Sequence, residues 1–168
     1  MKRMDQRGFS MVEMMVVIAI IGVLATLGVP SLVRMVPRIR LANQATQLAN
    51  EIAGQRMQAI AKSTDFRMVF DATGDSYTLE KWDGAAFKTY ARNTLGGVDL
   101  AGASGFDPDP PGNVLVVYGY GGASVPLGTK AVVLLRSSSG DNQKRVLVEA
   151  TGRAVVERLS PTGAWVAD

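Results

Sequence analysis

An uncharged stretch of twenty residues, from Met14 to Val33, constrains this chain more than any other feature. A helix of that length and apolar character can cross a lipid bilayer. Glu13 stands directly before the stretch, four residues inside the apolar segment that begins at Phe9. A carboxylate in that setting costs a few kcal/mol unless a partner neutralises it. The sequence therefore predicts a membrane-spanning helix in which Glu13 meets a positive group on a neighbouring copy.

The residues before this segment are mostly basic, with Lys2, Arg3 and Arg7 against Asp5. A secretory signal also begins with basic residues, but its apolar region spans about 7–15 residues and ends at a small-residue cleavage site. The apolar run here is longer, contains an acid and continues into an amphipathic pattern. Hydropathy alone leaves a plain signal anchor open, and that reading also keeps the basic end in the cytoplasm.

The order Gly8-Phe9-Ser10-x-x-Glu13 resembles the class III leader of type IV prepilins and type II secretion pseudopilins. The resemblance implies that a membrane aspartyl peptidase cuts between Gly8 and Phe9, removes residues 1–8 and N-methylates Phe9. In lipid, the new ammonium and the Glu13 carboxylate are both poorly solvated, so pairing them relieves both costs. Glu13 is thus the expected assembly contact. The alternative is a Glu13 that snorkels to the interface without a partner.

Composition excludes several functional classes. The chain has no cysteine and no histidine, which rules out disulfides, thiolate or imidazole metal sites, and Ser–His or Cys–His catalytic sets. We expect no enzymatic activity, no metal and no cofactor. The pI near 9.4 suggests a nucleic-acid partner. However, residues 1–8 hold +2 of the net charge of +3, so the processed chain carries +1 and has no general field for DNA.

Apolar spacing continues beyond the uncharged run. Residues at i, i+4, i+7 and i+11 predict an amphipathic helix, namely Leu41, Ala45, Leu48 and Ile52. Further apolar residues widen this stripe at Ala42, Ala49, Ala53, Met57 and Ile60. The opposite side is polar at Asn43, Gln44, Gln47, Asn50 and Gln55. One helix over about residues 9–62 would be on the order of 80 Å long, with its hydrophobic part at 9–37.

Four residues interrupt this helix: Gly22, Gly28, Pro30 and Pro37. The expected kink residues are Gly22 and Pro30, because Pro30 lacks an amide donor and crowds the preceding turn. Transmembrane helices also tolerate glycine and proline without any functional reason. The pilin resemblance implies that the segment from Gly22 to Pro30 loosens when subunits enter a filament.

After Ser63 the apolar period changes to two, which predicts strands. The expected strands are residues 66–70, 77–82, 87–90, 114–118, 132–135, 145–150 and 153–159. Glycine and proline predict an exposed loop over residues 101–113, and the tail after Ser160 is expected to be loose. The predicted fold class is α+β, a pilin-like arrangement of a long N-terminal transmembrane and amphipathic helix packed on an antiparallel β-sheet domain. Residues 38–168 would form the periplasmic unit.

The pattern from Lys144 to Val155 resembles the end of the GspH/FimT-type domain, because a basic and aliphatic strand turns through Thr151-Gly152-Arg153 into a last strand. The resemblance implies a low-abundance subunit. One such subunit is a minor pilin that helps to start a type IV pilus and stays in or near its tip. The alternative is a minor pseudopilin of type II secretion. The role of the loops at residues 96–128 stays open.

Some minor pilins of this type bind DNA during natural transformation through C-terminal arginines, which points to Arg145, Arg153 and Arg158. Arginines at strand edges also deter edge-to-edge pairing. The associated Gly-Arg-x-Arg arrangement lacks its second arginine here, since Val155 stands in that place. Nucleic acid is therefore not the expected partner.

The resemblance also implies a location and a set of partners. The chain would cross the bacterial inner membrane once, with its C-terminal domain in the periplasm, and would then enter a pilus or pseudopilus filament. Its partners would be other minor and major pilins or pseudopilins, the prepilin peptidase and the inner-membrane assembly platform.

Overall fold

The structure is a computed structural model that describes residues 10–107 and 113–168. Across these residues the chain forms one helix, α1 (Met11–Lys62), followed by nine strands. The chain divides into two compact units, Met1–Val36 and Pro37–Asp168. The second unit holds the last part of α1 and all of the strands.

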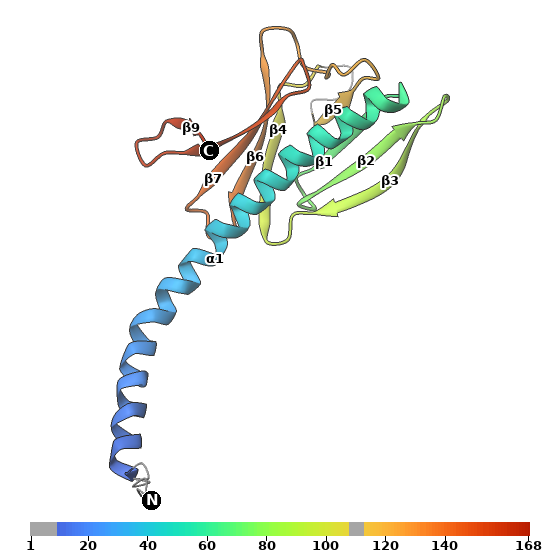
Figure 1. Cartoon of the computed structure of the whole chain (residues 1–168). Helices are drawn as coiled ribbons and strands as arrows, with labels where there is room; N and C mark the ends of the chain where they lie inside the picture. Colours follow the sequence, from blue (N-terminus) through green and yellow to red (C-terminus); the bar gives the residue numbers. More distant parts are fainter. Residues whose placement is uncertain (1–9, 108–112) are drawn as a thin grey trace, which may run out of the picture. The chain divides into compact units, whose positions relative to one another are not determined.

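The strands of the described chain form two antiparallel sheets, with the orders β3-β2-β1-β5 and β4-β6-β7-β8-β9. Their bounds are β1 (Phe66–Asp71), β2 (Ser76–Trp82), β3 (Phe87–Thr94), β4 (Val98–Ser104), β5 (Val114–Val117), β6 (Lys130–Ser137), β7 (Gln143–Glu149), β8 (Ala154–Leu159) and β9 (Trp165–Ala167). In Figure 1 the β1–β3 ribbon and the β6–β9 ribbon lie on either side of the last part of α1. The predicted α+β class with antiparallel sheets is confirmed.

One core joins this part of α1 to both sheets. The predicted helix positions Leu41, Ala45, Leu48 and Ile52 are 0–1% exposed and belong to this core. Alternate residues of the strands complete it, including Phe66, Met68 and Phe70 of β1 and Ala131, Val133 and Leu135 of β6. This alternation is what a sheet with one buried face requires.

The buried stripe of the helix is narrower than expected and differs in composition. Ala53 is exposed, Met57 is 67% exposed and Ile60 is 48% exposed, so the predicted widening of the stripe is wrong at these positions. Gln55, expected on the polar side, is only 1% exposed. Because Gln55 follows Leu48 by seven residues and Ile52 by three, it shares their face of the helix.

Two strands lie where the sequence predicted loop or tail. β4 includes residues 101–104, a segment of low β propensity that nevertheless pairs with β6 across a bulge between Leu100 and Gly102. β9 follows the turn after Ser160 and pairs with β8, with Leu159 opposite Trp165. Both expectations were wrong because pairing with a neighbouring strand outweighs local preference.

A glycine loop closes the end of α1. Ser63 has φ 45°, and the Thr64 amide donates to the Ala59 carbonyl, which ends the helix in a left-handed cap. The Gly119 amide donates to the Asp65 carboxylate at 2.8 Å. A Cβ on Gly119 would lie 2.9 Å from the Ser63 carbonyl carbon, so only glycine permits this approach.

Candidate functional site

Ser10 begins the helix as its N-cap. The Val12 amide donates to the Ser10 hydroxyl at 3.3 Å, and the Met14 amide donates to the Ser10 carbonyl at 3.2 Å. Glu13 is exposed and lies in the first turn, where its negative charge is favourable to the helix dipole. The spacing Ser10-x-x-Glu13 is also that of a capping box. Glu13 is thus placed to stabilise the helix start, and its predicted contact with another subunit stays a prediction.

The predicted cleavage site and methylated residue, Gly8 and Phe9, lie outside the described residues. Peptidase cleavage between them and N-methylation of Phe9 therefore stay predictions.

The N-terminal part of α1 exposes apolar side chains around its whole circumference. Their exposed fractions run from 43% to 83%, at Met11, Val12, Met14, Met15, Val16, Val17, Ile18, Ile20, Ile21, Val23 and Leu24. A helix that is apolar on all sides requires an apolar surrounding. One face carries a shallow hollow of about 340 Å³, lined by Val16, Ala19, Ile20, Val23 and Leu24.

Within residues 10–107 and 113–168, no helix combines the length and the apolar character needed to cross a membrane. The spanning helix expected over residues 9–37 stays a prediction. The assigned helix is continuous through Gly22 and Pro30, the two residues at which we predicted a kink. That kink stays a prediction.

The structure places the C-terminal arginines apart. Arg145 lies in β7 opposite Glu157 of β8, and the next pair is Lys144 opposite Arg158. Since neighbouring residues of a strand point to opposite faces, Arg145 and Arg158 lie on different faces of the sheet. Arg153 is exposed, and it lies just before β8 whereas Arg158 lies near its other end. The three residues form no common patch, and the expectation that nucleic acid is not a partner stays a prediction.

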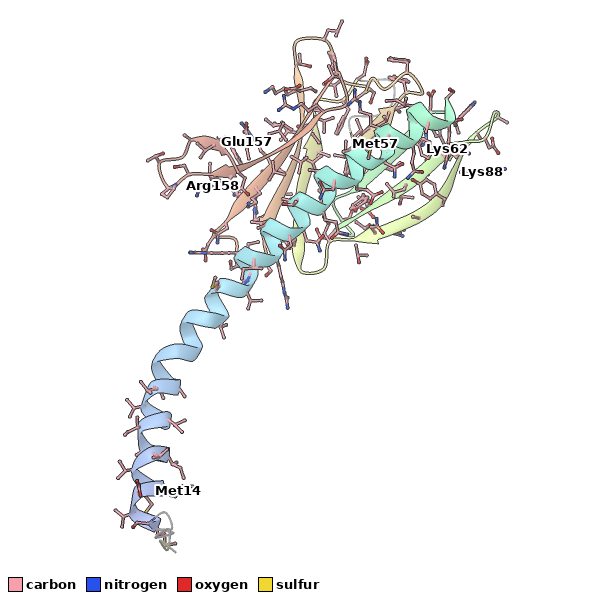
Figure 2. The ribbon with its side chains drawn as sticks, in the orientation of Figure 1. Met14, Met57, Lys62, Lys88, Glu157 and Arg158 are labelled. Carbon is pink, nitrogen blue, oxygen red and sulfur yellow. The ribbon has the colours of Figure 1, made fainter. Side chains whose placement is uncertain are left out.

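Arg145 instead holds β9 in place. Its Nη2 lies 2.7 Å from Glu157 Oε2, and its Nε donates to the same oxygen at 2.8 Å. Its guanidinium lies over the Trp165 ring, 4.4 Å from the centroid. Lys144, which points to the opposite face of the sheet, pairs with Asp168 after the end of β9. Figure 2 shows Glu157 and its neighbour Arg158 on β8. These contacts give Arg145 a structural role that its position in the sequence did not reveal.

A groove of about 320 Å³ opens where α1 ends, within the unit Pro37–Asp168. It is lined by Gln58, Lys62, Phe66, Lys81, Trp82, Asp83, Lys88, Thr89 and Tyr90. In the register of β1, β2 and β3, Phe66 lies opposite Lys81, and Lys81 lies opposite Lys88. Lys62 lies over the Phe66 ring, 5.7 Å from its centroid. The sequence analysis did not identify this groove, although the short connection between the expected strands 77–82 and 87–90 already brings Lys81 and Lys88 together.

Tyr90 forms the wall of the groove next to the helix. Its hydroxyl donates to Gln55 Oε1 at 2.7 Å, and Gln55 Nε2 donates to Glu51 at 2.9 Å. Its ring meets Phe66 edge to face at 6.1 Å. Burial raises the pKa of Tyr90 above its usual value, which keeps the hydroxyl protonated as a donor.

Asp83 and Lys88 form an ion pair at the rim, with 2.5 Å between Oδ2 and Nζ. The Asp83 carboxylate also accepts the amides of Ala85 and Ala86, each at 2.9 Å. The bond from Lys88, followed by these two amides, holds the pKa of Asp83 well below its usual range. The same pair raises the pKa of Lys88.

The described parts of the loops at residues 96–128 bridge the two sheets. The Ala123 amide donates to the carbonyl of Ala150 beside β7, and the Ser124 amide donates to the carbonyl of Val116 in β5. The Tyr118 and Tyr120 rings stack at 5.3 Å between centroids. These contacts assign the segment a structural role.

Residues 3–29 match the family described as the prokaryotic N-terminal methylation motif. A comparison of the sequence with curated proteins finds no match. Among solved structures the chain is similar to the minor pseudopilin EpsH from the type 2 secretion system of Vibrio cholerae, with 17% identity and a TM-score of 0.55, over 73% of this chain and 98% of EpsH. A second EpsH crystal structure shows 14% identity and a TM-score of 0.54, over 73% of this chain and 97% of that one.

The type IV minor pilin FimU of Pseudomonas aeruginosa is also similar, with 12% identity and a TM-score of 0.53, over 77% of this chain and 94% of FimU. At sequence identities this low, the structural similarity shows a shared fold and nothing more. The expected resemblance to prepilins at the N-terminus is confirmed by the motif match. The chain therefore carries the N-terminal methylation motif of prepilin-type proteins, and its domain has the pilin-like α+β fold of EpsH and FimU.

Proposed function

We propose that this protein is a minor pilin of a type IV pilus that helps to initiate assembly and is located in or near the filament tip. The observation that carries the proposal is the combination of the methylation motif at residues 3–29 with a domain folded like FimU. Neither feature alone would support it, because the motif says nothing of the domain and the fold alone says nothing of the N-terminus.

In this proposal residues 9–37 anchor the precursor in the bacterial inner membrane, with the domain in the periplasm. A prepilin peptidase removes residues 1–8 and methylates Phe9. The assembly platform then moves the subunit into the filament, where lipid contacts of the apolar helix are replaced by contacts with other pilin helices. The exposed face with Ala19 at its centre supports this step, because a small residue lets another helix approach closely.

The alternative is a minor pseudopilin of a type II secretion system, which the likeness to EpsH favours. The two TM-scores, 0.55 for EpsH and 0.53 for FimU, do not separate the two systems. Deleting the gene in its host distinguishes them. Loss of surface pili with normal secretion of exported hydrolases supports the pilus, and the reverse supports the secretion system.

We propose further that the protein is not an enzyme and binds DNA neither in general nor through its C-terminal arginines. The lack of histidine and cysteine supports the first statement. The engagement of Arg145 by Glu157 and Trp165 supports the second. Retention of the protein on duplex DNA at moderate salt would contradict it.

Two substitutions test the assembly role. Gly8→Ala should leave residues 1–8 attached, which intact-protein mass spectrometry detects, whereas Gly22→Ala should be processed normally. Glu13→Gln keeps the size of the side chain but removes its charge. We expect this variant to reach the membrane and to be absent from sheared filaments, while the control Met15→Leu is incorporated. Normal incorporation of Glu13→Gln would overturn the proposed role of the carboxylate.

A further inference from the structure

The groove at the end of α1 lies beside an open sheet edge. β3 (Phe87–Thr94) is the terminal strand of its sheet, and the strand to which it pairs within the described chain is β2. Figure 1 draws it as the outermost strand on that side. Most of its residues are exposed, so its outward amides and carbonyls are open to another strand.

The charge of the groove beside this edge favours a negatively charged ligand. Of the charged residues that line the groove, three are basic, Lys62, Lys81 and Lys88, and one is acidic, Asp83. Lys81 and Lys88 face each other across β2 and β3, and like charges in that position destabilise a sheet. Figure 2 shows Lys62 and Lys88 at the same end of the domain, one from the helix and one from the edge strand. An anionic group between these ammonium groups would relieve their repulsion.

Protection against edge pairing explains only part of this arrangement. Lysines and bulges on an edge strand prevent unwanted strand pairing. That reasoning covers Lys88 and the bulge at Tyr90, which has no partner in the register of β2 and β3. It does not cover Lys81, which lies on the inner strand β2, or Lys62, which lies on the helix. Attraction of a negatively charged ligand accounts for the positions of all three lysines.

We propose that this groove and the adjoining edge of β3 bind an extended acidic segment of another protein. The segment adds a strand to β3 through main-chain hydrogen bonds. Its carboxylates lie between Lys62, Lys81 and Lys88, and one of its apolar side chains packs on the exposed part of the Tyr90 ring. A groove of about 320 Å³ accommodates one or two side chains of such a segment. The inference concerns the unit Pro37–Asp168 and holds whether or not the protein enters a filament.

A nucleic acid fits the groove less well. Binding that is driven by phosphates typically draws on six to ten contacts, about one for each basic side chain. The groove supplies three lysines, and Lys88 already pairs with Asp83 at 2.5 Å. An acidic peptide needs fewer charges because the strand edge contributes main-chain bonds.

The test is selection from a phage-displayed library of random dodecapeptides on the full-length protein in detergent micelles. We expect enrichment of peptides with at least two aspartates or glutamates among apolar residues. The best peptide, synthesised free, should lose affinity at least tenfold for the double variant Lys81→Gln with Lys88→Gln. The matched control, Lys130→Gln with Arg136→Gln, removes two positive charges from β6 and should bind like the parent.

Folding does not confound the result. The groove variant removes two facing like charges together with the Lys88–Asp83 ion pair, so the two effects offset and its melting temperature should lie close to that of the parent. Lys62→Gln, at the exposed end of the helix, is a second variant and should weaken binding at least threefold. The proposal is wrong if no peptide is enriched, if the enriched peptides are not acidic, or if both double variants bind equally. Tighter lysine-dependent binding of single-stranded oligothymidine, or lysine-dependent self-association, would also overturn it by identifying a different occupant.

Discussion

Replacing Tyr90 by phenylalanine removes one oxygen atom and nothing else. The ring still meets Phe66 edge to face, but Gln55 loses the hydroxyl that donates to its Oε1 at 2.7 Å. Gln55 is 1% exposed, so its amide oxygen has little access to water. The variant therefore isolates one hydrogen bond that ties the edge strand β3 to the helix.

The magnitude follows from these two environments. A buried acceptor that loses its donor costs about 1–3 kcal/mol. Tyr90 is 49% exposed, so water can approach the space that the hydroxyl leaves. We therefore expect a loss of stability at the lower end of this range, about 1 kcal/mol. For a domain of this size that corresponds to a decrease in melting temperature of roughly 3–4 °C. In a Gln55→Met background, where the acceptor is already gone, Tyr90→Phe should cost about 0.3 kcal/mol or less.

The assay is urea unfolding of residues 38–168 followed by circular dichroism, for the parent, both single variants and the double variant. The coupling between the two positions should be about 0.7–1 kcal/mol. If Tyr90→Phe costs the same in both backgrounds, the hydrogen bond does not stabilise the fold and the reasoning fails. A changed denaturant slope would instead indicate that the variant alters the compactness of the folded or unfolded state.

Three further predictions concern other parts of the domain. Asp83 has a lowered pKa, so the stability that its carboxylate contributes is fully present above pH 3.8, the ordinary pKa of an aspartate, and is lost as the pH falls below that value. Asp83→Asn should therefore flatten the acid side of a plot of unfolding free energy against pH. Ser63→Gly should raise the free energy of unfolding by about 1 kcal/mol, since Ser63 has φ 45° and glycine adopts that conformation freely; an unchanged urea midpoint would contradict it. Trp165→Ala removes the ring under Arg145, and amide exchange in β9 should accelerate at least tenfold while β6 stays protected.

Strong periodicity made part of the fold predictable. Leu41, Ala45, Leu48 and Ile52 are buried as expected because each helical turn returns an apolar residue to the same face. The strands that begin at Phe66 and Phe87 also appear where alternation predicted them. In these segments local preference and tertiary packing favour the same structure.

The failures arose where a partner outside the local sequence decides the structure. The residues around Gly102 resemble a loop and become a strand because β6 offers an open edge. Gln55 has a polar side chain but lies on the buried face, where its amide nitrogen donates to Glu51 and its amide oxygen accepts from the distant Tyr90. The groove lysines were missed for the same reason, since their proximity depends on the register of three strands and on the place where the helix ends.

The continuity of α1 has a mechanical consequence. Leu41, Ala45, Leu48 and Ile52 all sit in the core on one uninterrupted helix. Tension applied at Pro37 along the helix axis would therefore strain these four side chains in parallel, as in shear, rather than releasing them one after another as in peeling. Close packing passes such strain directly to both sheets. Force applied at Pro37 would thus act on the whole domain at once, and the rupture force should be high for a pull along the helix and low for a pull across it.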